Sequence, residues 1–392
     1  MESNTKISGK IKIIDFSPYY SPHIGGLEKY AEELHENLAK KDCQITVFTP
    51  HIPQSALKEE SRTNIRIIRY PAFDIIFNYP LPSLWKREFW NQWEKINTDQ
   101  FDIAISTVRF FVQPLMALFF AKKHKIPILH IEHCSDYVKN RFVVSFIARI
   151  VDMTIGRFSL SHADKIITPS QSAARFVHVL SGKEASVIYR GMPFSEIDTT
   201  PPQDALRQQI GNKKIITSVG RLIYGKGIIH LLEAIHFLKR SDIFLLVVGD
   251  GQEKKNLEKY IEKDKLSEQV KFLGNIPFDE VIGILKITDI FINPSYNEGL
   301  PTSVLEAGVC RRAIIATDVG GTLEIITPDR SGIIIKPHNT QKVKNALEEL
   351  LDNVPLRNSL GENAREEIEK KFNWEKSTLA YLKEIGSLQK KL

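Results

Sequence analysis

The sequence predicts an α/β protein built from two doubly wound parallel sheets in tandem. Apolar strand-like runs alternate with helix-like runs along the chain, and such alternation implies parallel sheets with helices on both faces. The pattern restarts at Lys213, just after the proline-containing segment Pro193–Gln203 interrupts regular structure. A chain of 392 residues is long enough for two domains. We therefore expect a first domain over residues 1–195, a second over residues 196–372 and a final helix over residues 373–392.

In the first domain, short apolar runs bounded by turn residues mark the expected strands. These strands are Lys12–Phe16, Gln44–Thr49, Asn64–Arg69, Asp102–Ser106, Pro127–Ile131 and Lys165–Thr168. Amphipathic helices are expected between several of them, at Leu27–Lys40 and Gln171–Leu180. Because ligands of open α/β sheets bind at the carboxyl ends of strands, polar or glycine-rich segments that follow these runs are candidate site residues.

Residues 139–158 carry apolar side chains at helical spacing, with Arg141, Arg149 and Arg157 off the apolar stripe. The pattern favours a core helix of the first domain with a solvated basic face. The alternative is partial contact with an anionic membrane, to which the aromatic segment Trp85–Trp90 would contribute.

The second domain opens with a buried strand, Lys213–Gly220, and an amphipathic helix, Ile228–Lys239. Further strands are expected near Phe244–Val248, Val270–Leu273, Ile290–Asn293, Ala313–Ala316 and Gly332–Lys336. A helix should begin after the Gly-Leu-Pro segment that ends at Pro301, with Thr302 or Ser303 as its N-cap.

Composition excludes several classes of protein. An apolar share of 42% and a charged share of 26% are typical of a soluble globular protein. Three scattered cysteines do not make a disulfide framework or a zinc site, which favours a reducing compartment. The N-terminal residues lack the apolar core of a signal peptide, and the longest uncharged apolar run, Phe110–Ala121, is too short to span a membrane. We expect a cytoplasmic protein, with peripheral contact at the cytoplasmic face of a membrane as an open alternative.

The formal charge of +6 is concentrated in one part of the first domain. Residues 101–195 contain 12 Lys and Arg against 6 Asp and Glu, whereas the segments on either side are balanced. Such an excess suggests an anionic partner, such as a lipid phosphate, a membrane surface or an acidic glycan. Nucleic acid fits less well, because no recognised binding module accompanies the basic stretch.

Two groups of charged residues follow strands of the second domain. Arg221 and Lys226 lie in a glycine-bearing loop between a strand and a helix, which is a natural anion pocket. Glu298 precedes the helix expected after Pro301, and Glu306 lies on its first turns. Chance alone often produces two acids at this spacing, and solvated loop cations are common. Together, however, these residues suit a ligand that carries both phosphate and hydroxyl groups.

These motifs resemble the donor-binding half of retaining glycosyltransferases of family four (glycosyl transferases group 1), which have the GT-B fold. The resemblance rests on Gly220-Arg221, Lys226-Gly227 and the spacing of Glu298 and Glu306, and it extends over roughly residues 11–385. Further landmarks are Gly25-Gly26-Leu27-Glu28, Val248-Gly249-Asp250-Gly251, Phe272-Leu273-Gly274, Asp318-Val319-Gly320-Gly321 and Phe372-Asn373-Trp374. It implies two Rossmann-like domains that face each other across a cleft, with a C-terminal helix that returns to the first domain.

The resemblance also implies roles for individual residues. Arg221 and Lys226 would hold the donor diphosphate and stabilise it as it leaves, without a metal ion or other cofactor. Glu306 would bind ribose hydroxyls and Glu298 hydroxyls of the donor sugar, assisted by backbone N–H groups. Those N–H groups belong to Gly299 and Leu300. In the first domain, Gly25 and Gly26 would approach the donor phosphates, and His133 would contact the transferred sugar.

The implied function is transfer of a hexose-type sugar from a nucleotide-diphosphate donor to a glycan or polyprenyl- or lipid-linked acceptor. Assembly of a cell-surface polysaccharide, a lipopolysaccharide or a glycolipid would use such a reaction, and the basic first domain would receive the acceptor. Two alternatives stay open. One is a sugar-nucleotide 2-epimerase of the same fold, and the other is a non-catalytic subunit that binds a sugar nucleotide.

Overall fold

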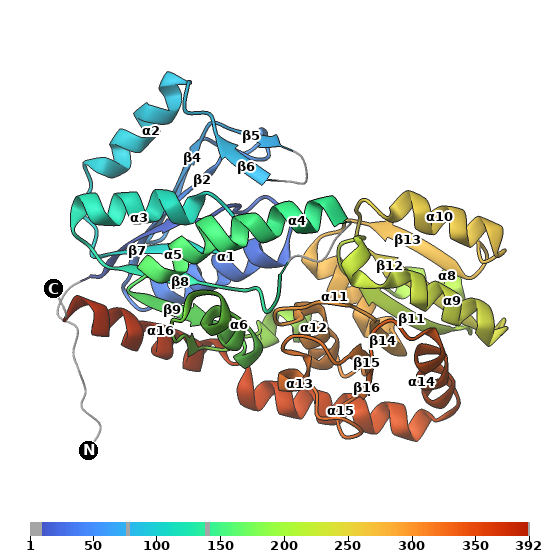
Figure 1. The fold of residues 1–392 in the computed structure, drawn as a ribbon. Helices are drawn as coiled ribbons and strands as arrows, with labels where there is room; N and C mark the ends of the chain where they lie inside the picture. The colour runs from blue at the N-terminus through green and yellow to red at the C-terminus, as the bar shows by residue number, and fades with distance from the viewer. Residues whose placement is uncertain (1–9, 76–78, 138–141, 391–392) are drawn as a thin grey trace, which may run out of the picture. The chain divides into compact units, whose positions relative to one another are not determined.

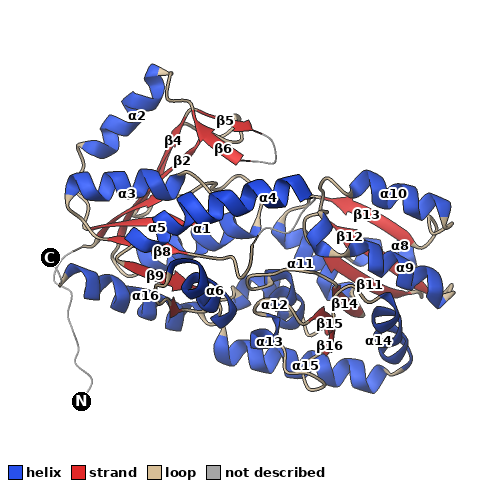
Figure 2. Cartoon of the chain, viewed as in Figure 1, coloured by secondary structure: helices blue, strands red, loops and turns tan. Residues whose placement is uncertain are grey.

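A computed structural model describes residues 10–75, 79–137 and 142–390, which form two compact units (Figure 1). Unit 1 contains residues 10–75, 79–137, 143–191 and 374–390, and unit 2 contains residue 142 and residues 192–373. The chain therefore leaves unit 1 after Gly191 and re-enters it at Trp374. Figure 2 shows that each unit is a sheet flanked by helices.

The main sheet of unit 1 has the strand order β10-β9-β8-β7-β1-β2-β4-β3 and is parallel except for its edge strand β3. Its strands are β1 (Lys12–Phe16), β2 (Gln44–Pro50), β3 (Glu59–Arg62), β4 (Ile65–Tyr70), β7 (Ile103–Thr107), β8 (Ile128–Ile131), β9 (Lys165–Thr168) and β10 (Ser186–Val187). A separate hairpin pairs β5 (Ala72–Ile75) with β6 (Tyr79–Pro82). The expected parallel α/β arrangement is confirmed, although the sequence analysis missed β3, β5, β6 and β10.

Helices cover both faces of this sheet because side chains of a strand alternate between its faces. Ile13 of β1 packs under one helical layer, formed by α1 and α16, and Ile14 packs under the other, formed by α2, α3, α5 and α6. The helices of unit 1 are α1 (Gly26–Ala39), α2 (Arg87–Asn97), α3 (Gln113–His124), α4 (Phe142–Val151, whose first residue is assigned to unit 2), α5 (Arg157–His162), α6 (Gln171–Ser181) and α16 (Trp374–Gln389).

The C-terminal helix α16 belongs to unit 1, as the sequence predicts. The hydroxyl groups of Tyr30 on α1 and Tyr381 on α16 are hydrogen-bonded to each other in the core. The chain also passes α16 closely at Gly191, where a Cβ atom would lie 2.2 Å from Cγ of Trp374. A larger residue at position 191 would therefore push the start of α16 away.

Unit 2 has a fully parallel sheet with the strand order β13-β12-β11-β14-β15-β16. Its strands are β11 (Lys214–Val219), β12 (Ile243–Val248), β13 (Val270–Gly274), β14 (Ile290–Asn293), β15 (Ala313–Thr317) and β16 (Ile333–Ile335). Its helices are α7 (Phe194–Thr199), α8 (Asp204–Ile210), α9 (Ile228–Leu238), α10 (Lys254–Lys263), α11 (Phe278–Ile287), α12 (Thr302–Val309), α13 (Thr322–Ile325), α14 (Thr340–Asp352) and α15 (Val354–Lys371).

The strand order of unit 2 reverses between β11 and β14. The chain moves outward from β11 through β12 to β13, then returns to the other side of β11 at β14 and continues to β16. The reversal brings the loops that leave β11 and β14 together at the carboxyl edge of the sheet, the position at which open α/β sheets bind ligands. This position is where the predicted cations and carboxylates fall in the sequence.

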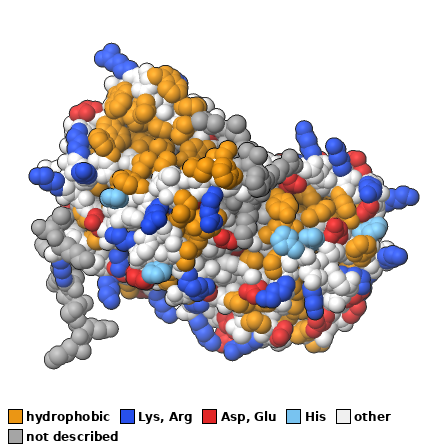
Figure 3. Space-filling model, in the orientation of Figure 1, with side chains coloured by type: hydrophobic (Ala, Val, Ile, Leu, Met, Phe, Trp, Pro, Cys, Tyr) orange, Lys and Arg blue, Asp and Glu red, His pale blue; other side chains and the backbone are white. Residues whose placement is uncertain are grey.

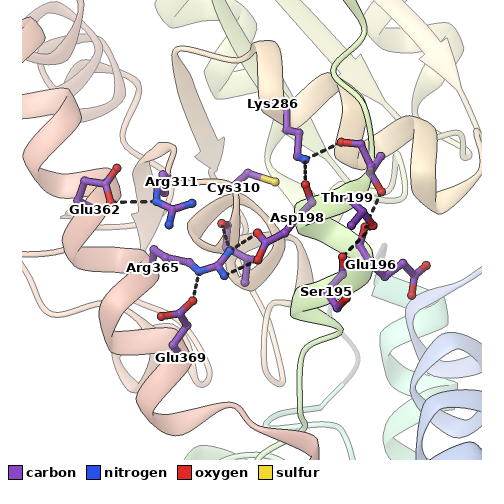
Figure 4. Close-up of polar contacts among 12 residues, drawn as sticks. Ser195, Glu196, Asp198, Thr199, Lys286, Cys310, Arg311, Glu362, Arg365 and Glu369 are labelled. Carbon is purple, nitrogen blue, oxygen red and sulfur yellow. Dashed lines mark hydrogen bonds and ion pairs between the residues drawn. The ribbon is translucent and has the colours of Figure 1, made fainter.

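Helix α7 lies in the segment where the sequence predicts interrupted structure, and ion pairs fix it within unit 2 (Figure 4). The guanidinium of Arg365 on α15 donates two hydrogen bonds to the Asp198 carboxylate, at 2.7 and 2.8 Å, and one to the Val309 carbonyl at 2.8 Å. Lys286 donates to the carbonyl oxygens of Asp198 and Thr200. These contacts hold α7, the first helix of unit 2, in place, and those of Arg365 attach it to α15.

The prediction that residues 139–158 form a core helix with its apolar stripe inward was wrong. Within the described part of that segment, α4 continues through a π-helical turn, Asp152–Gly156, into α5, and residues 139–141 lie outside the described residues. The side chains that face the core include Ala148 and the fully buried Asp152, whereas Phe146 and Ile150 are exposed. The buried ion pair between Asp152 and Arg109 fixes the side of this helical segment that faces the core. The apolar stripe lies on the other side and therefore faces outward.

Within the described residues, no helix combines the length and the apolar composition needed to cross a membrane.

Candidate active site

The loop after β11 presents two cations at the carboxyl edge of the unit 2 sheet. Arg221 lies two residues after the end of the strand, and Lys226 ends a short 3₁₀ turn, Tyr224–Lys226. Gly227 then turns the chain into α9 with φ of +62°, and a Cβ atom there would lie 2.2 Å from the Pro294 carbonyl oxygen. Only glycine fits this position, because both the left-handed backbone and the close approach exclude a side chain. The loops after β11 and β14 are thus in backbone contact.

Glu298 lies in the loop after β14 and forms an ion pair with Lys226. The Lys226 Nζ atom is 2.6 Å from Glu298 Oε1, and the two side chains are 20% and 10% exposed. The Ser295 hydroxyl lies 2.7 Å from the same carboxylate oxygen, and the Asn293 amide donates to it at 3.3 Å. Residues from two loops therefore converge on one carboxylate.

The protonation state of Glu298 follows from these contacts. Burial alone would raise the pKa of its carboxyl group, but the Lys226 ammonium and the hydrogen bonds from Ser295 and Asn293 outweigh burial and hold the pKa below its ordinary value. Glu298 is therefore ionised at neutral pH and accepts hydrogen bonds. One oxygen receives the contacts with Lys226, Ser295 and Asn293.

The loop after β15 supports the backbone beside Glu298. Gly320 has φ of +56°, and a Cβ atom there would lie 1.8 Å from the Glu298 carbonyl oxygen. The next residue, Gly321, donates its N–H to the Gly299 carbonyl at 2.8 Å. Gly299 and Leu300, both half-buried, lead from this contact into α12. The loop after β15 thus supports the backbone that leads through Gly299 and Leu300, both of which are predicted site residues.

The structure places the remaining predicted residues of unit 2 on the elements expected for them. Glu306 lies on the second turn of α12 and is half-buried. Arg221 is exposed, and its guanidinium has no hydrogen-bond or ion-pair partner among the described residues. The predicted cap of α12 was wrong: Pro301 occupies the N-cap position, no side chain caps this end, and Thr302 already has helical backbone.

In unit 1, Gly25 and Gly26 lie where the loop after β1 enters α1. Gly25 is the N-cap of that helix, and a Cβ atom there would lie 2.2 Å from the Glu28 carboxylate. That carboxylate is buried and paired with Nδ1 of His23 at 2.6 Å. The imidazole of His23 also stacks on Tyr19. Gly25 therefore leaves room for a polar cluster that holds the loop against the first turn of α1.

His133 follows β8, whereas His130 lies inside that strand. The His133 and Tyr30 rings pack edge to face with their centroids 4.6 Å apart. The Nε2 atom of His133 is buried without a hydrogen-bond partner among the described residues. Burial lowers the pKa of His133 to about 4, and the nearby Arg190 contributes in the same direction. The imidazole is neutral at pH 7, and its unused nitrogen suits a hydroxyl group.

Sequence analysis missed a buried charge cluster beside this histidine. Arg109, after β7, lies 3.1 Å from both the Glu132 and Asp152 carboxylates, and all three side chains are almost fully buried. Burial raises the pKa of the Asp152 carboxyl, and Arg109 only partly offsets this effect. Glu132 also accepts the backbone N–H groups of Arg109 and Cys134. A signal was available, because Arg109 lies two residues after β7 and Glu132 directly after β8, both at the carboxyl ends of apolar strands.

Asn293, at the end of the expected strand Ile290–Asn293, and Ser295, two residues later, were not predicted as site residues, yet both hydrogen-bond Glu298. Their polar side chains at the end of a buried strand were the available signal. No cluster of three or more His, Cys, Asp or Glu side chains in the described ranges is arranged to hold a metal ion. The chemistry that unit 2 offers is a free guanidinium, a paired ammonium and an ionised carboxylate around one loop junction. This set can bind a phosphate and hydroxyl groups together.

Comparisons with known proteins agree across both units. The family described as Glycosyltransferase Family 4 matches residues 24–196, and the family described as Glycosyl transferases group 1 matches residues 203–367. An uncharacterized glycosyltransferase of Methanocaldococcus jannaschii is 33% identical over 384 residues, which cover 95% of this chain and 98% of that protein.

Solved structures share the fold at low sequence identity. Sucrose-phosphate synthase from Thermosynechococcus elongatus superposes with a TM-score of 0.81 at 20% identity, over 97% of this chain and 99% of that one. The Anabaena protein HepE, solved in complex with UDP-glucose, superposes with a TM-score of 0.77 at 16% identity, over 96% and 100% of the two chains. The GT-B fold expected from the sequence is thereby confirmed.

Proposed function

Because the chain belongs to the group 1 glycosyltransferases, we propose that it moves a hexose-type sugar from a nucleotide-diphosphate donor to a glycan or lipid-linked acceptor with retention of anomeric configuration. The observation that carries the proposal is the junction of the β11 and β14 loops, where Lys226 pairs with the ionised Glu298. The β11 loop also carries Arg221, whose guanidinium has no partner among the residues that the structure describes. A sugar diphosphate needs both cations for its phosphates and a carboxylate for its hydroxyls.

Each charged residue has a distinct part in the proposed reaction. The exposed guanidinium of Arg221 takes two phosphate oxygens, and Lys226 gives a point charge that is already positioned by Glu298. The Glu298 carboxylate accepts hydroxyls of the donor sugar, and Glu306 binds the ribose. In unit 1, the neutral His133 offers its buried Nε2 atom to a hydroxyl of the transferred sugar.

In the proposed transfer, an acceptor hydroxyl oxygen forms a bond to the anomeric carbon while the bond from that carbon to the diphosphate breaks. The nucleoside diphosphate leaves with the bonding electron pair, and one of its phosphate oxygens takes the proton from the acceptor. Arg221 and Lys226 stabilise the negative charge that builds on the leaving group, so the proposal requires neither a metal ion nor another cofactor.

The acceptor part of the proposal rests on charge. The excess of +6 lies within residues 101–195, and a phosphate-bearing acceptor such as a polyprenyl-linked saccharide is attracted to such a region. Assembly of a cell-surface polysaccharide or glycolipid is the process that would use this reaction.

The test combines donor binding with transfer. Nucleotide-diphosphate sugars are screened by thermal shift, since a bound donor raises stability by mass action, and the binder is then offered to saccharide and polyprenyl-linked acceptors in the presence of EDTA. We expect a product with the anomeric configuration of the donor, and at least a roughly 10²-fold loss of kcat/KM for Lys226→Ala and Glu298→Ala. Lys254→Ala, which removes a surface pair with Asp250 in the same unit, is the matched control.

Three outcomes would contradict the proposal. Full activity in both Lys226→Ala and Glu298→Ala would show that these two residues do not have the roles assigned to them. A donor whose sugar is epimerised at C2 without any acceptor identifies an epimerase instead. If circular dichroism shows that the protein is folded, and it binds a donor but transfers the sugar to none of the acceptors, it is a non-catalytic binding subunit.

A further inference from the structure

The outer side of the helical layer of α2, α3, α4 and α5 exposes an unusual number of large apolar side chains. Figure 3 shows hydrophobic side chains gathered over these helices on the face in view. Nine of them, between 45% and 71% exposed, define what we call the outer apolar surface: Leu84, Trp85, Trp90, Phe119, Phe146, Ile147, Ile150, Met153 and Phe158. Gathered large apolar side chains on a soluble fold mark an interaction surface, whereas isolated ones need no explanation.

Contacts between the helices make this surface continuous. The ring of Trp93 on α2 contacts both Phe89, next to Trp90, and Phe119 on α3. Helix α3 in turn packs against α5, which carries Phe158 and continues α4 through the π-helical turn. The surface therefore runs from the start of α2 to the exposed face of α4.

The exposed charges on α3, α4 and α5 are all cationic, whereas α2 also carries Glu88, which pairs with Lys58, and the exposed Glu94. Lys86 and Arg87 adjoin Trp85, Lys122 lies near Phe119, and Arg149 and Arg157 flank the apolar side chains of α4 and α5; all five are exposed. Lys86, Arg87, Lys122 and Arg157 have no ion-pair partner among the described residues. The only acidic residue in α3, α4, the π-helical turn and α5 is Asp152, which is fully buried against Arg109.

This combination points to one class of occupant. We propose that the outer apolar surface docks on an anionic lipid membrane, with the aromatic and aliphatic side chains in the interfacial region and the cations against the headgroups. Exposed aromatic and aliphatic side chains with more flanking Lys and Arg than Asp and Glu are the composition typical of such an interface. A second copy of the chain fits less well, because an isologous contact would bring cations of the same kind together.

The docking inference is independent of the sugar-transfer proposal, since it is tested without donor or acceptor. The full chain is mixed with vesicles of phosphatidylcholine, with and without phosphatidylglycerol, and the bound fraction is measured by flotation. We expect binding to vesicles that contain phosphatidylglycerol, little binding to phosphatidylcholine alone, and a decline as salt screens the headgroup charge.

Matched variants separate this surface from the rest of the molecule. Phe146→Ser combined with Phe158→Ser should weaken vesicle binding about tenfold or more, whereas Phe237→Ser, an equally exposed phenylalanine on α9, should leave it unchanged. Arg157→Glu should weaken binding several-fold, and Lys259→Glu, an exposed lysine on α10, should not. All of these positions are exposed, so the variants should keep the circular dichroism spectrum and melting temperature of the wild type.

The proposal is overturned if the wild-type chain fails to bind phosphatidylglycerol vesicles. It is also overturned if it binds neutral vesicles equally well, or if the Phe146/Phe158 variant binds as the wild type does. If light scattering shows a dimer that these two substitutions convert to monomer, the surface belongs to a second copy and the lipid assignment is wrong.

Discussion

Trp374, the first residue of α16, donates its indole N–H to the Glu33 carboxylate of α1 at 3.2 Å, across 341 positions of sequence. The same carboxylate oxygen lies 2.5 Å from the Arg190 guanidinium, just before the chain leaves unit 1. One buried carboxylate thus joins α1, the exit of unit 1 and the helix that returns to it.

This relationship predicts a selective loss of stability in unit 1. Trp374→Phe should lower the free energy of unfolding by about 1–3 kcal/mol, because Glu33 loses a hydrogen bond in a buried place. Trp85→Phe, at a 71% exposed position, should change it by less than about 0.5 kcal/mol. All four tryptophans lie in unit 1, so urea unfolding followed by tryptophan fluorescence reports on that unit. Equal midpoints for the two variants would show that the contact with Glu33 contributes no stability.

A second prediction concerns the attachment of α7 in unit 2. Arg365→Lys removes the bidentate hydrogen bonds that the buried Arg365 donates to Asp198. The free energy of unfolding should fall by about 1–3 kcal/mol. Arg311→Lys alters an exposed pair with Glu362 and should cost less than about 0.5 kcal/mol. Thermal unfolding followed by circular dichroism measures both. The prediction fails if the two substitutions lower the melting temperature by the same amount.

The backbone beside Glu298 gives a third prediction. Gly320→Ala should displace the Glu298 carbonyl, because the new Cβ would overlap it at 1.8 Å, and donor affinity should fall about tenfold or more. Gly182→Ala, at the end of α6, has a similar positive φ but no atom within 4 Å of the new Cβ. It should cost about 1 kcal/mol of stability and leave donor affinity unchanged. Titration with the donor identified above compares the two variants.

The Lys226–Glu298 pair has a predictable pH dependence. Since the pKa of Glu298 is held below its ordinary value, the pair's contribution to stability is fully present above the ordinary glutamate range and is lost as pH falls through the lowered, folded-state pKa. Glu298→Gln abolishes this dependence. The difference between the unfolding free energies of wild type and variant should stay constant from pH 7 to about 5 and shrink at lower pH. A difference that grows on acidification would contradict the assignment of Glu298 as the ionised partner.

His133 should also make the protein less stable in acid, but over a higher pH window. Its folded-state pKa of about 4 lies below the ordinary histidine value, so the unfolded chain binds the extra proton between about pH 6.5 and 4. Stability is therefore lost as pH falls through this window, by up to about 3 kcal/mol, and His133→Gln should recover that loss. Nuclear magnetic resonance of the imidazole would show a titration near pH 4. A His133 signal that titrates near 6.5 would show that burial does not control its protonation.

Much of the fold could be predicted from local sequence. β1, β14 and the helix that begins at Gln171 were expected within a residue or two of their observed bounds, because strong apolar periodicity decides such elements. The short edge strand β3 was missed, since Glu59–Arg62 has a polar composition and owes its strand form to pairing with β4.

In the candidate site, too, local sequence predicts which residues take part but not how they contact one another. Arg221, Lys226, Glu298 and Glu306 were singled out because they follow strands at the sheet edge. The contact between Lys226 and Glu298 spans 72 positions and depends on how two loops meet, which no local pattern encodes. The outward stripe of α4 was misjudged for a related reason: periodicity shows that a helix has an apolar face, but not that Arg109, on another element, would hold Asp152 inward.

The return of the chain to unit 1 at Trp374 has a consequence for biosynthesis. A ribosome completes all of unit 2 before it makes the helix that covers α1, so the nascent first unit carries an uncovered apolar face while the second can already fold. Chaperone protection during translation should therefore concentrate on α1, and ribosome-stalled chains that end before Trp374 should be cut by protease within residues 10–137 while residues 192–373 resist.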